Sequence, residues 1–319
     1  MMRVTGWFVI LGCWLAAGCG QPPAPPQTPP ESPAPPTPIA AVPEPDVPAP
    51  WLRATEPFHI IDGIYWVGSE GLGAYLFTSD EGHILLDGGL PQTAAQIEAS
   101  IAALGFDLAD VEILLNSHAH FDHSGGLAEL KRRSGALLYA HEGDVSALEG
   151  GFYLGSEEVE RWRAPPVSVD RVLEDGDVVT LGGRRLVLHH TPGHSRGCSS
   201  WGTTATSEGG DLSVLVFCSA SVAANRLVDP PQYPGIVDDY RATFAKARTL
   251  KVDVPLAAHA EFFRLIEKRD AAAANPEGPG FVDPDAFARL MTQFEADFER
   301  QLTEQTSRAG RNTATSAHP

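Results

Sequence analysis

The order of apolar and polar positions from residue 75 onward predicts strands and helices in turn. Residues 75–89 hold two apolar runs around a Ser-Asp-Glu-Gly turn, which is typical of two short strands. Between Pro91 and Gly105 the apolar residues recur at helical spacing, and these two residues suit the start and the end of a helix. The continuous apolar run at 111–118 then predicts a buried strand.

The same alternation continues along the rest of the chain, without a repeat of fixed period. We expect a helix after Gly125, strands at 135–142, within 178–194 and at 213–221, a helix at 235–250, a strand ending in 252–261, a helix from about 260 and an amphipathic helix at 283–302. This order is typical of one continuous α/β domain, which we place at residues 51–305. The polar residues 306–319 are expected to form a disordered tail.

Residues 1–19 have the composition of a secretory signal peptide. They combine one positive charge at Arg3, a short apolar core and small residues before Cys19. The ending Leu-Ala-Ala-Gly-Cys resembles a bacterial lipobox and predicts a lipid on Cys19, with ordinary cleavage without a lipid as the alternative. Gly20 replaces the aspartate that signals inner-membrane retention, so we expect a periplasmic protein that is anchored to the outer membrane as a lipoprotein.

Composition adds a linker and limits the partners. Residues 20–50 are rich in proline, with 14 prolines from residue 21 to residue 50, which predicts a semi-rigid spacer rather than part of a core. The chain of 319 residues has a formal net charge of -18, which argues against nucleic acid or an anionic membrane face as a partner. We expect a monomer.

Three histidines and one aspartate lie within six residues after the apolar run at 111–118. His118 and His120 are two residues apart, so their side chains point to the same side on an extended backbone. Asp122 continues this alternation and His123 breaks it, so a single tetrahedral ion would not take all four side chains. The spacing therefore favours two metal ions side by side, each with further ligands from elsewhere in the chain.

Two more histidines follow predicted strands, His194 in a Pro-Gly turn and His259 at a strand end. We assign one ion to His118, His120 and His194, and the other ion to Asp122, His123 and His259. Three protein ligands leave one position open, which is the mark of a catalytic zinc site rather than a structural one. Nitrogen and oxygen ligands suit zinc and tolerate other divalent ions. The sequence therefore predicts two Zn²⁺ ions as cofactors.

Cysteine and serine side chains offer other chemistry near these histidines. Cys198 and Cys218 lie within the domain, where an oxidising compartment favours a disulfide and two buried free thiols are the alternative. Ser117 and Ser195 stand beside histidines, but nothing else in the sequence makes them nucleophiles. We therefore expect metal-dependent chemistry rather than a serine mechanism.

The motif His-X-His-X-Asp-His at 118–123 resembles the signature of the metallo-β-lactamase superfamily. The likeness covers most of residues 55–265, including Thr-Pro-Gly-His-Ser-Arg-Gly-Cys at 191–198 and Ala-Ala-His-Ala-Glu-Phe-Phe at 257–263. The resemblance implies an α/β fold, a four-layer αββα sandwich with the site at one edge of its sheets. The sequence is most similar to the third subclass of the zinc β-lactamases.

The strand at 213–221 distinguishes this subclass from other relatives. Glyoxalase II, the lactonases and the phosphodiesterases of the superfamily place a metal-bridging aspartate after this strand, and the first β-lactamase subclass places a cysteine ligand there. The matching residue here is Ser219, with Ser221 two residues further on. The resemblance implies that both serines bind the substrate carboxylate and that Cys198 pairs with Cys218. A register shift of one residue would instead make Cys218 a metal ligand.

The resemblance implies a function as well. We expect zinc-dependent hydrolysis of the β-lactam amide bond of penicillins, cephalosporins and carbapenems, which confers antibiotic resistance. A zinc-bound hydroxide is the expected nucleophile, and Asp122 is the catalytic residue that orients it. Relatives often have proline after the last ligand, where this chain has Ala260, and this departure bears on substrate preference. The alternatives are a lactone or thioester hydrolase of the superfamily and a non-catalytic zinc-binding envelope lipoprotein.

Overall fold

The computed structural model describes the backbone of residues 46–276 and 278–316, and the side chains of 46–276 and 278–311. These residues belong to one compact unit. The predicted signal peptide, the lipidation site Cys19 and nearly all of the proline-rich linker lie outside the described residues, so export and lipid attachment stay predictions. Within the described part of the chain, no helix is both long enough and apolar enough to cross a membrane.

The first of two central sheets has seven strands in chain order, β1 to β7. Neighbouring strands are antiparallel from β1 to β4 and parallel from β4 to β7. A parallel pair needs a crossover connection, and helices between the later strands supply it. The strands are Phe58–Ile61, Ile64–Trp66, Tyr75–Ser79, Gly82–Leu86, Val111–Leu115, Leu137–His141 and Arg171–Leu173.

The second sheet has five strands in the order β12-β11-β10-β9-β8. The pairs from β8 to β11 are antiparallel, and β12 is parallel to β11. The two sheets share one core, in which Trp66 and Tyr75 of the first sheet meet Leu188 and Trp201 of the second. The strands are Val178–Leu181, Arg184–His190, Ser199–Ser207, Gly210–Phe217 and Val254–Ala257.

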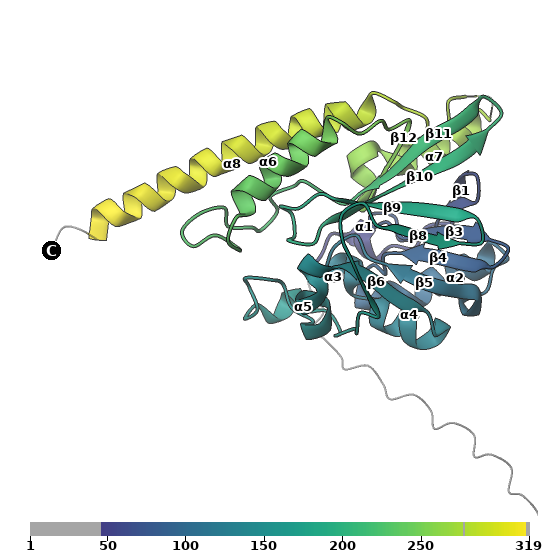
Figure 1. Cartoon of the computed structure of the whole chain (residues 1–319), viewed down its shortest axis with the longest axis horizontal. Helices are drawn as coiled ribbons and strands as arrows, with labels where there is room; N and C mark the ends of the chain where they lie inside the picture. The colour runs from purple at the N-terminus through teal and green to yellow at the C-terminus, as the bar shows by residue number, and fades with distance from the viewer. Residues whose placement is uncertain (1–45, 277, 317–319) are drawn as a thin grey trace, which may run out of the picture. The chain divides into compact units, whose positions relative to one another are not determined.

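Helices cover the outer face of each sheet (Figure 1). α2, α4 and α5 lie on the first sheet, where Ile97 and Leu130 belong to a second core. α6 and α8 lie on the second sheet, where Phe244 and Phe287 are buried. This is the four-layer αββα sandwich that the resemblance implied. The helices are α1 Ala49–Leu52, α2 Ala94–Ala103, α3 Phe121–Ser124, α4 Leu127–Ser134, α5 Glu142–Gly150, α6 Ile236–Ala247, α7 Leu265–Ala274 and α8 Ala286–Ser316, with 3-10 turns at Pro91–Thr93, Leu108–Asp110, Glu160–Trp162 and Ala260–Phe263.

The C-terminal helix differs from the prediction. α8 is continuous over Ala286–Ser316, so residues 306–316, which were expected to be disordered, are helical. Gln305 directly precedes this stretch, and its contacts hold α8 at that point. Its side chain accepts a hydrogen bond from the Leu227 backbone N–H at 2.7 Å and donates one to the Asn225 carbonyl at 3.2 Å. The polar composition of residues 306–316 does not reveal that the helix is held just before them, because these contacts join Gln305 to a loop far away in the sequence.

The predicted site residues follow the ends of four strands. His118 comes three residues after β5, His194 four residues after β9, Ser219 two residues after β11 and His259 two residues after β12. Because β11 and β12 are parallel, their carboxyl ends lie at the same edge of the sheet. The strands therefore hold these loops in place at an edge where the loops face outward.

Candidate metal centre

The motif runs from a loop onto a short helix. β5 ends before the motif, and His120 has an extended backbone with φ -76° and ψ 148°. Asp122 and His123 are consecutive residues on the single turn of α3, which explains why His123 breaks the alternation of the preceding residues. The helix expected after Gly125 is confirmed as α4, whereas the single turn of α3 before it was not predicted.

His118, His120 and His194 converge, and we call these three residues the triad side. Nε2 of His194 lies 3.1 Å from Nε2 of His118 and 3.1 Å from Nδ1 of His120. All three side chains are buried. His194 also donates its Nδ1–H to the Ser221 carbonyl at 2.8 Å, so the lone pair of its Nε2 points to the centre of the triad.

Asp122, His123 and His259 converge next to the triad, and we call them the carboxylate side. Oδ2 of Asp122 lies 3.2 Å from Nε2 of His123 and 3.5 Å from Nε2 of His259. The two Nε2 atoms are 3.1 Å apart. Donor atoms of His118, Asp122 and His123 also lie within 4.8 Å of one another, so the two sides adjoin at His118.

The donor atoms fit a divalent metal. In a tetrahedral zinc site with Zn–N bonds of about 2.0–2.1 Å, neighbouring ligand atoms are about 3.3 Å apart. The distances from 3.1 to 3.5 Å on both sides match this spacing. A neutral histidine ring has only one N–H, so these nitrogens are not all satisfied by one another. A cation would satisfy the lone pairs that face one another.

Burial keeps the triad side neutral. It is the largest cause that holds the pKa of His118 and of His120 well below the ordinary value, and neighbouring histidines lower both further. Burial also lowers the pKa of His194 to about 4, although its hydrogen bond to Ser221 works in the opposite direction. A neutral imidazole is the form that binds metal. The triad side therefore presents three neutral nitrogen ligands at neutral pH.

The carboxylate side carries charge instead. Burial alone would raise the pKa of Asp122, but His123 and His259 outweigh it and lower that pKa below its usual range. Burial disfavours the protonated form of His123, but Asp122 and then Asp87 outweigh it and raise the pKa of His123 to about 10. Burial and His123 lower the pKa of His259 to about 3. A metal ion bound here would replace the proton of His123 as the partner of Asp122.

Asp87 supports the segment that precedes the motif, and sequence reasoning missed it. Its side chain is buried and its backbone is left-handed, with φ 66°. The carboxylate accepts hydrogen bonds from the Ser117 N–H and hydroxyl, both at 2.6 Å, and from Asn116 Nδ2 at 3.2 Å. Oδ2 of Asp87 also lies 3.6 Å from Nδ1 of His123. The available signal was an acid at the end of an apolar strand, followed by two glycines.

Two aromatic side chains cover ligand histidines, and sequence reasoning missed both. Tyr153 stacks on His120 with ring centroids 4.0 Å apart and an angle of 11° between the planes. Its hydroxyl donates a hydrogen bond to Oδ1 of Asn225 at 2.9 Å. Trp51 lies against His259 with centroids 5.1 Å apart. These contacts come from loops and from the start of the domain, where no sequence motif indicates them.

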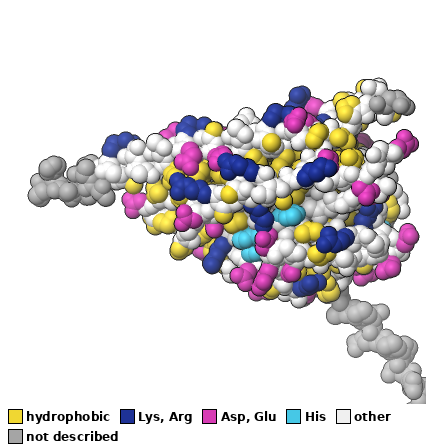
Figure 2. Space-filling model, turned by 45° about the horizontal axis from the view of Figure 1, so that its top comes forward, with side chains coloured by type: hydrophobic (Ala, Val, Ile, Leu, Met, Phe, Trp, Pro, Cys, Tyr) yellow, Lys and Arg dark blue, Asp and Glu magenta, His cyan; other side chains and the backbone are white. Residues whose placement is uncertain are grey.

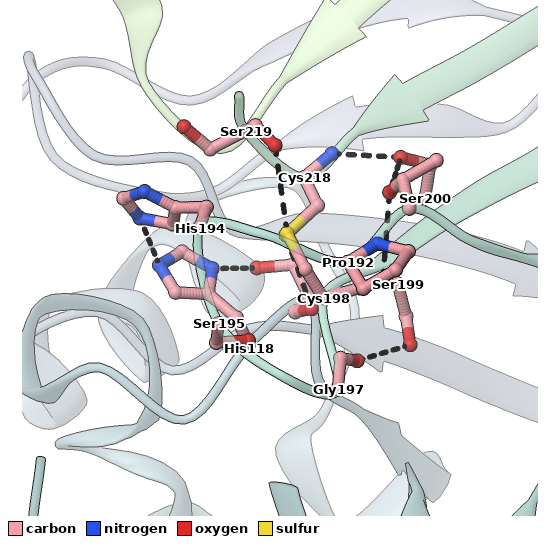
Figure 3. The surroundings of a disulfide bond; sticks show 12 residues. His118, Pro192, His194, Ser195, Gly197, Cys198, Ser199, Ser200, Cys218 and Ser219 are labelled. Carbon is pink, nitrogen blue, oxygen red and sulfur yellow. Dashed lines mark hydrogen bonds between the residues drawn. A yellow bond between two sulfur atoms is a disulfide. The ribbon is translucent and has the colours of Figure 1, made fainter. Parts of the chain in front are cut away.

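Figure 3 shows the disulfide between Cys198 and Cys218 beside the triad side. It confirms the expected bridge and removes Cys218 as a thiolate ligand. Ser219 follows the bridge and is only 1% exposed, whereas Ser221 is partly exposed. The two serine hydroxyls lie 3.2 Å apart, and the Ser221 hydroxyl lies 3.3 Å from Nδ1 of His194. Ser221 is therefore the serine that a bound molecule can reach first.

The face of the molecule in Figure 2 mixes acidic and basic side chains, with histidine side chains visible between them. Ion pairs occur on the surface, for example between Arg53 and Glu70 at 2.8 Å. This face has no uninterrupted basic patch of the kind that binds nucleic acid. The exclusion of nucleic acid as a partner rests on the net charge and stays a prediction.

Solved structures with this fold include two from one enzyme class. BJP-1, a subclass B3 metallo-β-lactamase of Bradyrhizobium japonicum, is 46% identical, with a TM-score of 0.79 over 82% of this chain and 98% of that chain. The native FEZ-1 metallo-β-lactamase from Legionella gormanii is 33% identical, with a TM-score of 0.77 over 82% of this chain and 99% of that chain. The family model described as the metallo-β-lactamase superfamily matches residues 74–259, which contain all six predicted ligands.

Curated relatives with similar sequences include enzymes of another class. The acyl-coenzyme A thioesterase MBLAC2 of Gallus gallus is 40% identical over 97 residues, which are 25% of this chain and 33% of that protein. The Bos taurus thioesterase MBLAC2 is 34% identical over 164 residues, which are 46% of this chain and 50% of that protein. The chain thus spans between a third and a half of the length of these two relatives.

Proposed function

The chain belongs to the metallo-β-lactamase superfamily, and we propose that it hydrolyses the β-lactam amide bond of antibiotics with two zinc ions as cofactors. The coarser conclusion, a metal-dependent hydrolase of this superfamily, follows from the family match together with the clustered histidines and aspartate. The β-lactam substrate is supported by the 46% identity to a subclass B3 enzyme over 98% of that enzyme's length. Penicillins, cephalosporins and carbapenems are the substrates we propose.

The observation that carries this proposal is the pair of serine hydroxyls after β11. The Ser221 hydroxyl lies beside His194 and beside the Ser219 hydroxyl. The resemblance implies that Ser219 stands where glyoxalase II and the lactonases have a metal-bridging aspartate. A neutral hydroxyl is a poor zinc ligand, but it donates a hydrogen bond to the carboxylate of a β-lactam. Because Ser219 is buried, we assign that contact to Ser221 and assign to Ser219 the role of orienting it.

The side chains at the metal centre can be assigned roles in β-lactam hydrolysis. Zinc, when bound, lowers the pKa of a water ligand to about 7 and polarises a carbonyl oxygen. The Asp122 carboxylate stays ionised and accepts the proton of the attacking water. Water is the nucleophile in this reaction. Ser117 and Ser195 are not assigned that role, because their hydroxyls donate hydrogen bonds to Asp87 and Asp144.

Thioester hydrolysis is the second candidate, and the similarity to the MBLAC2 thioesterases favours it. Those matches cover at most 46% of this chain, whereas the structural matches to BJP-1 and FEZ-1 each cover 82% of it. The segment after β11 also has serines, and not the metal-bridging aspartate that the resemblance places there in glyoxalase II and the lactonases. For these reasons we rank thioesters, and lactones with them, below β-lactams.

The function is tested by incubating the full-length protein with one penicillin, one cephalosporin, one carbapenem, one acyl-coenzyme A and one lactone, each with and without a metal chelator. We expect turnover of at least one β-lactam that the chelator abolishes and zinc restores. Turnover of the thioester or the lactone alone would make one of these the substrate class. Zinc binding without turnover of any compound would identify a non-catalytic zinc protein.

A further inference from the structure

Asp144 is a buried carboxylate that neither ligand set uses. It lies in the first turn of α5 and is 2% exposed. Its Oδ2 accepts hydrogen bonds from the Ala119 N–H at 2.9 Å and from the Ser195 hydroxyl at 2.7 Å. Its Oδ1 accepts a hydrogen bond from the Gly197 N–H at 2.8 Å. Three donors around one side chain satisfy an ionised carboxylate, which only accepts.

These three donors lie in the two segments that carry the triad side. Ala119 stands between His118 and His120, and Ser195 directly follows His194. His118 and His194 are 76 residues apart in the sequence, and neither segment has regular secondary structure at these positions. One carboxylate therefore connects both loops that present the three histidines.

Two glycines allow this close connection. A Cβ atom on Gly197 would lie 2.5 Å from the Asp144 backbone nitrogen and 2.6 Å from its Cγ. A Cβ atom on Gly143 would lie 2.7 Å from the carbonyl oxygen of Arg196. Neither glycine has a left-handed backbone, so the space between α5 and the His194 loop, rather than the conformation, requires glycine at both positions.

We propose that Asp144 is the positioning residue of the triad side, because it sets the distance between the loop of His118 and His120 and the loop of His194. The hydrogen bonds of Asp144 reach Ala119 in the loop before α3 and Ser195 and Gly197 in the His194 loop, but no residue of α3, which carries Asp122 and His123, and none after β12, where His259 lies. Loss of Asp144 should therefore weaken metal binding on one side only. The inference rests on the proposed metal centre, but it does not depend on the proposed substrate.

Asp144→Asn is the sharpest substitution, because asparagine has the same shape. An amide group presents one oxygen and one NH₂ group, so one carboxylate acceptor becomes a donor. In one orientation the NH₂ group faces the Gly197 N–H, and in the other it faces the Ala119 N–H. Neither orientation satisfies both backbone donors, so the substitution removes at least one backbone hydrogen bond and weakens the connection between the loops without a large change in volume.

The test measures zinc affinity rather than turnover. Metal-free full-length protein is titrated with Zn²⁺ against a chromogenic chelator, which resolves two dissociation constants. For Asp144→Asn we expect one site to weaken by roughly 10- to 100-fold, as is usual for groups that orient metal ligands, while the other site keeps its affinity. Asp144→Asn should lower zinc affinity by a similar factor when it is added to His259→Ala, because that variant leaves the triad side intact. When it is added to His194→Ala, which disrupts the triad side, it should cause no further loss of zinc affinity.

Matched variants separate positioning from general stability. Gly197→Ala pushes the His194 loop away from Asp144 and should weaken the same zinc site as Asp144→Asn. Ser195→Ala removes one of the three hydrogen bonds of Asp144 and should weaken that site by a smaller factor. Asp170→Asn is the control, because Asp170 accepts the Leu138 N–H at 2.7 Å without any bond to a ligand loop, and it should change neither constant. Equal weakening of both sites, or unchanged zinc affinity with a lower melting temperature, would overturn the proposal.

Discussion

The triad side and the carboxylate side lie next to each other and have the same origin, because each takes two ligands from the motif after β5 and one from the end of a strand of the second sheet. They differ in charge, since the triad side has three neutral imidazoles, which burial keeps unprotonated. The carboxylate side has Asp122, whose negative charge raises the pKa of His123 to about 10. We propose that this difference divides the roles, so that the triad side would hold a metal through neutral ligands and Asp122 would accept the proton of the attacking water.

The largest expected effect comes from Asp122→Asn, which removes the charge that distinguishes the carboxylate side. We predict that turnover of a β-lactam falls by roughly 10²- to 10⁴-fold, because a positioned proton acceptor contributes about that much to a rate. The triad side should still bind one zinc ion per molecule, measured by elemental analysis. Asp170→Asn serves as the matched control and should keep its turnover. Unchanged turnover in Asp122→Asn would remove this carboxylate from the mechanism.

A second effect concerns the disulfide, which lies beside the triad side. Cys198 follows His194 in the same loop, and the bridge to Cys218 spans 20 residues. We predict that the double variant Cys198→Ser, Cys218→Ser loses about 3 kcal/mol of free energy of unfolding, the amount expected for a loop of this length. Urea unfolding of the oxidised protein and of the variant measures the loss. Equal midpoints for the two proteins would contradict the prediction.

The last effect is a pH dependence of the stability of the metal-free protein, to which His123 contributes with the opposite sign to His194 and His259. His194 and His259 have pKa values of about 4 and 3 in the folded state, below 6.5, so their contribution is lost as pH falls from about 6.5 through those values. The pKa of His123 is raised to about 10, so its contribution is complete below 6.5 and is lost as pH rises toward 10. We therefore predict a stability maximum near pH 6.5.

Urea unfolding midpoints across this pH range, with chelator present, measure the two arms of the curve. Asp122→Asn should flatten the alkaline arm, because it removes the main partner of the His123 proton. The acidic arm should remain, since His194 loses only a minor contribution from Asp122. A stability that rises steadily toward pH 10 would show that His123 is not protonated in the folded metal-free protein.

Much of the fold and most of the candidate site could be predicted from local patterns. The ligand residues from His118 to His123 are close in the sequence, so a few rigid bonds already bring their side chains together. His194 and His259 were recognisable because each stands at the end of an apolar run, where a strand stops and a loop begins. The disulfide was predictable once export and the family resemblance left two cysteines to pair.

Residues that act only through distant neighbours could not be predicted in this way. Asp144 stands in an ordinary helical start, and nothing near it in sequence shows that Ala119 and Ser195 will donate to its carboxylate. Gln305 directly precedes the residues that were expected to be disordered, yet it donates a hydrogen bond to the Asn225 carbonyl. Such roles depend on pairs separated by tens to hundreds of residues, and no local pattern records a pair of that kind.

The sequence by itself determined which atoms are available for metal, because the identity and the close spacing of His118, His120, Asp122 and His123 are set by covalent structure. The tertiary structure alone decided which of these atoms meet His194 and His259, since packing of two sheets brings separate strand ends to one edge. It also decided the protonation of each histidine, because burial and the distance to Asp122 exist only in the folded chain. Charge and geometry at this centre are therefore properties of the fold, whereas the ligand types are properties of the sequence.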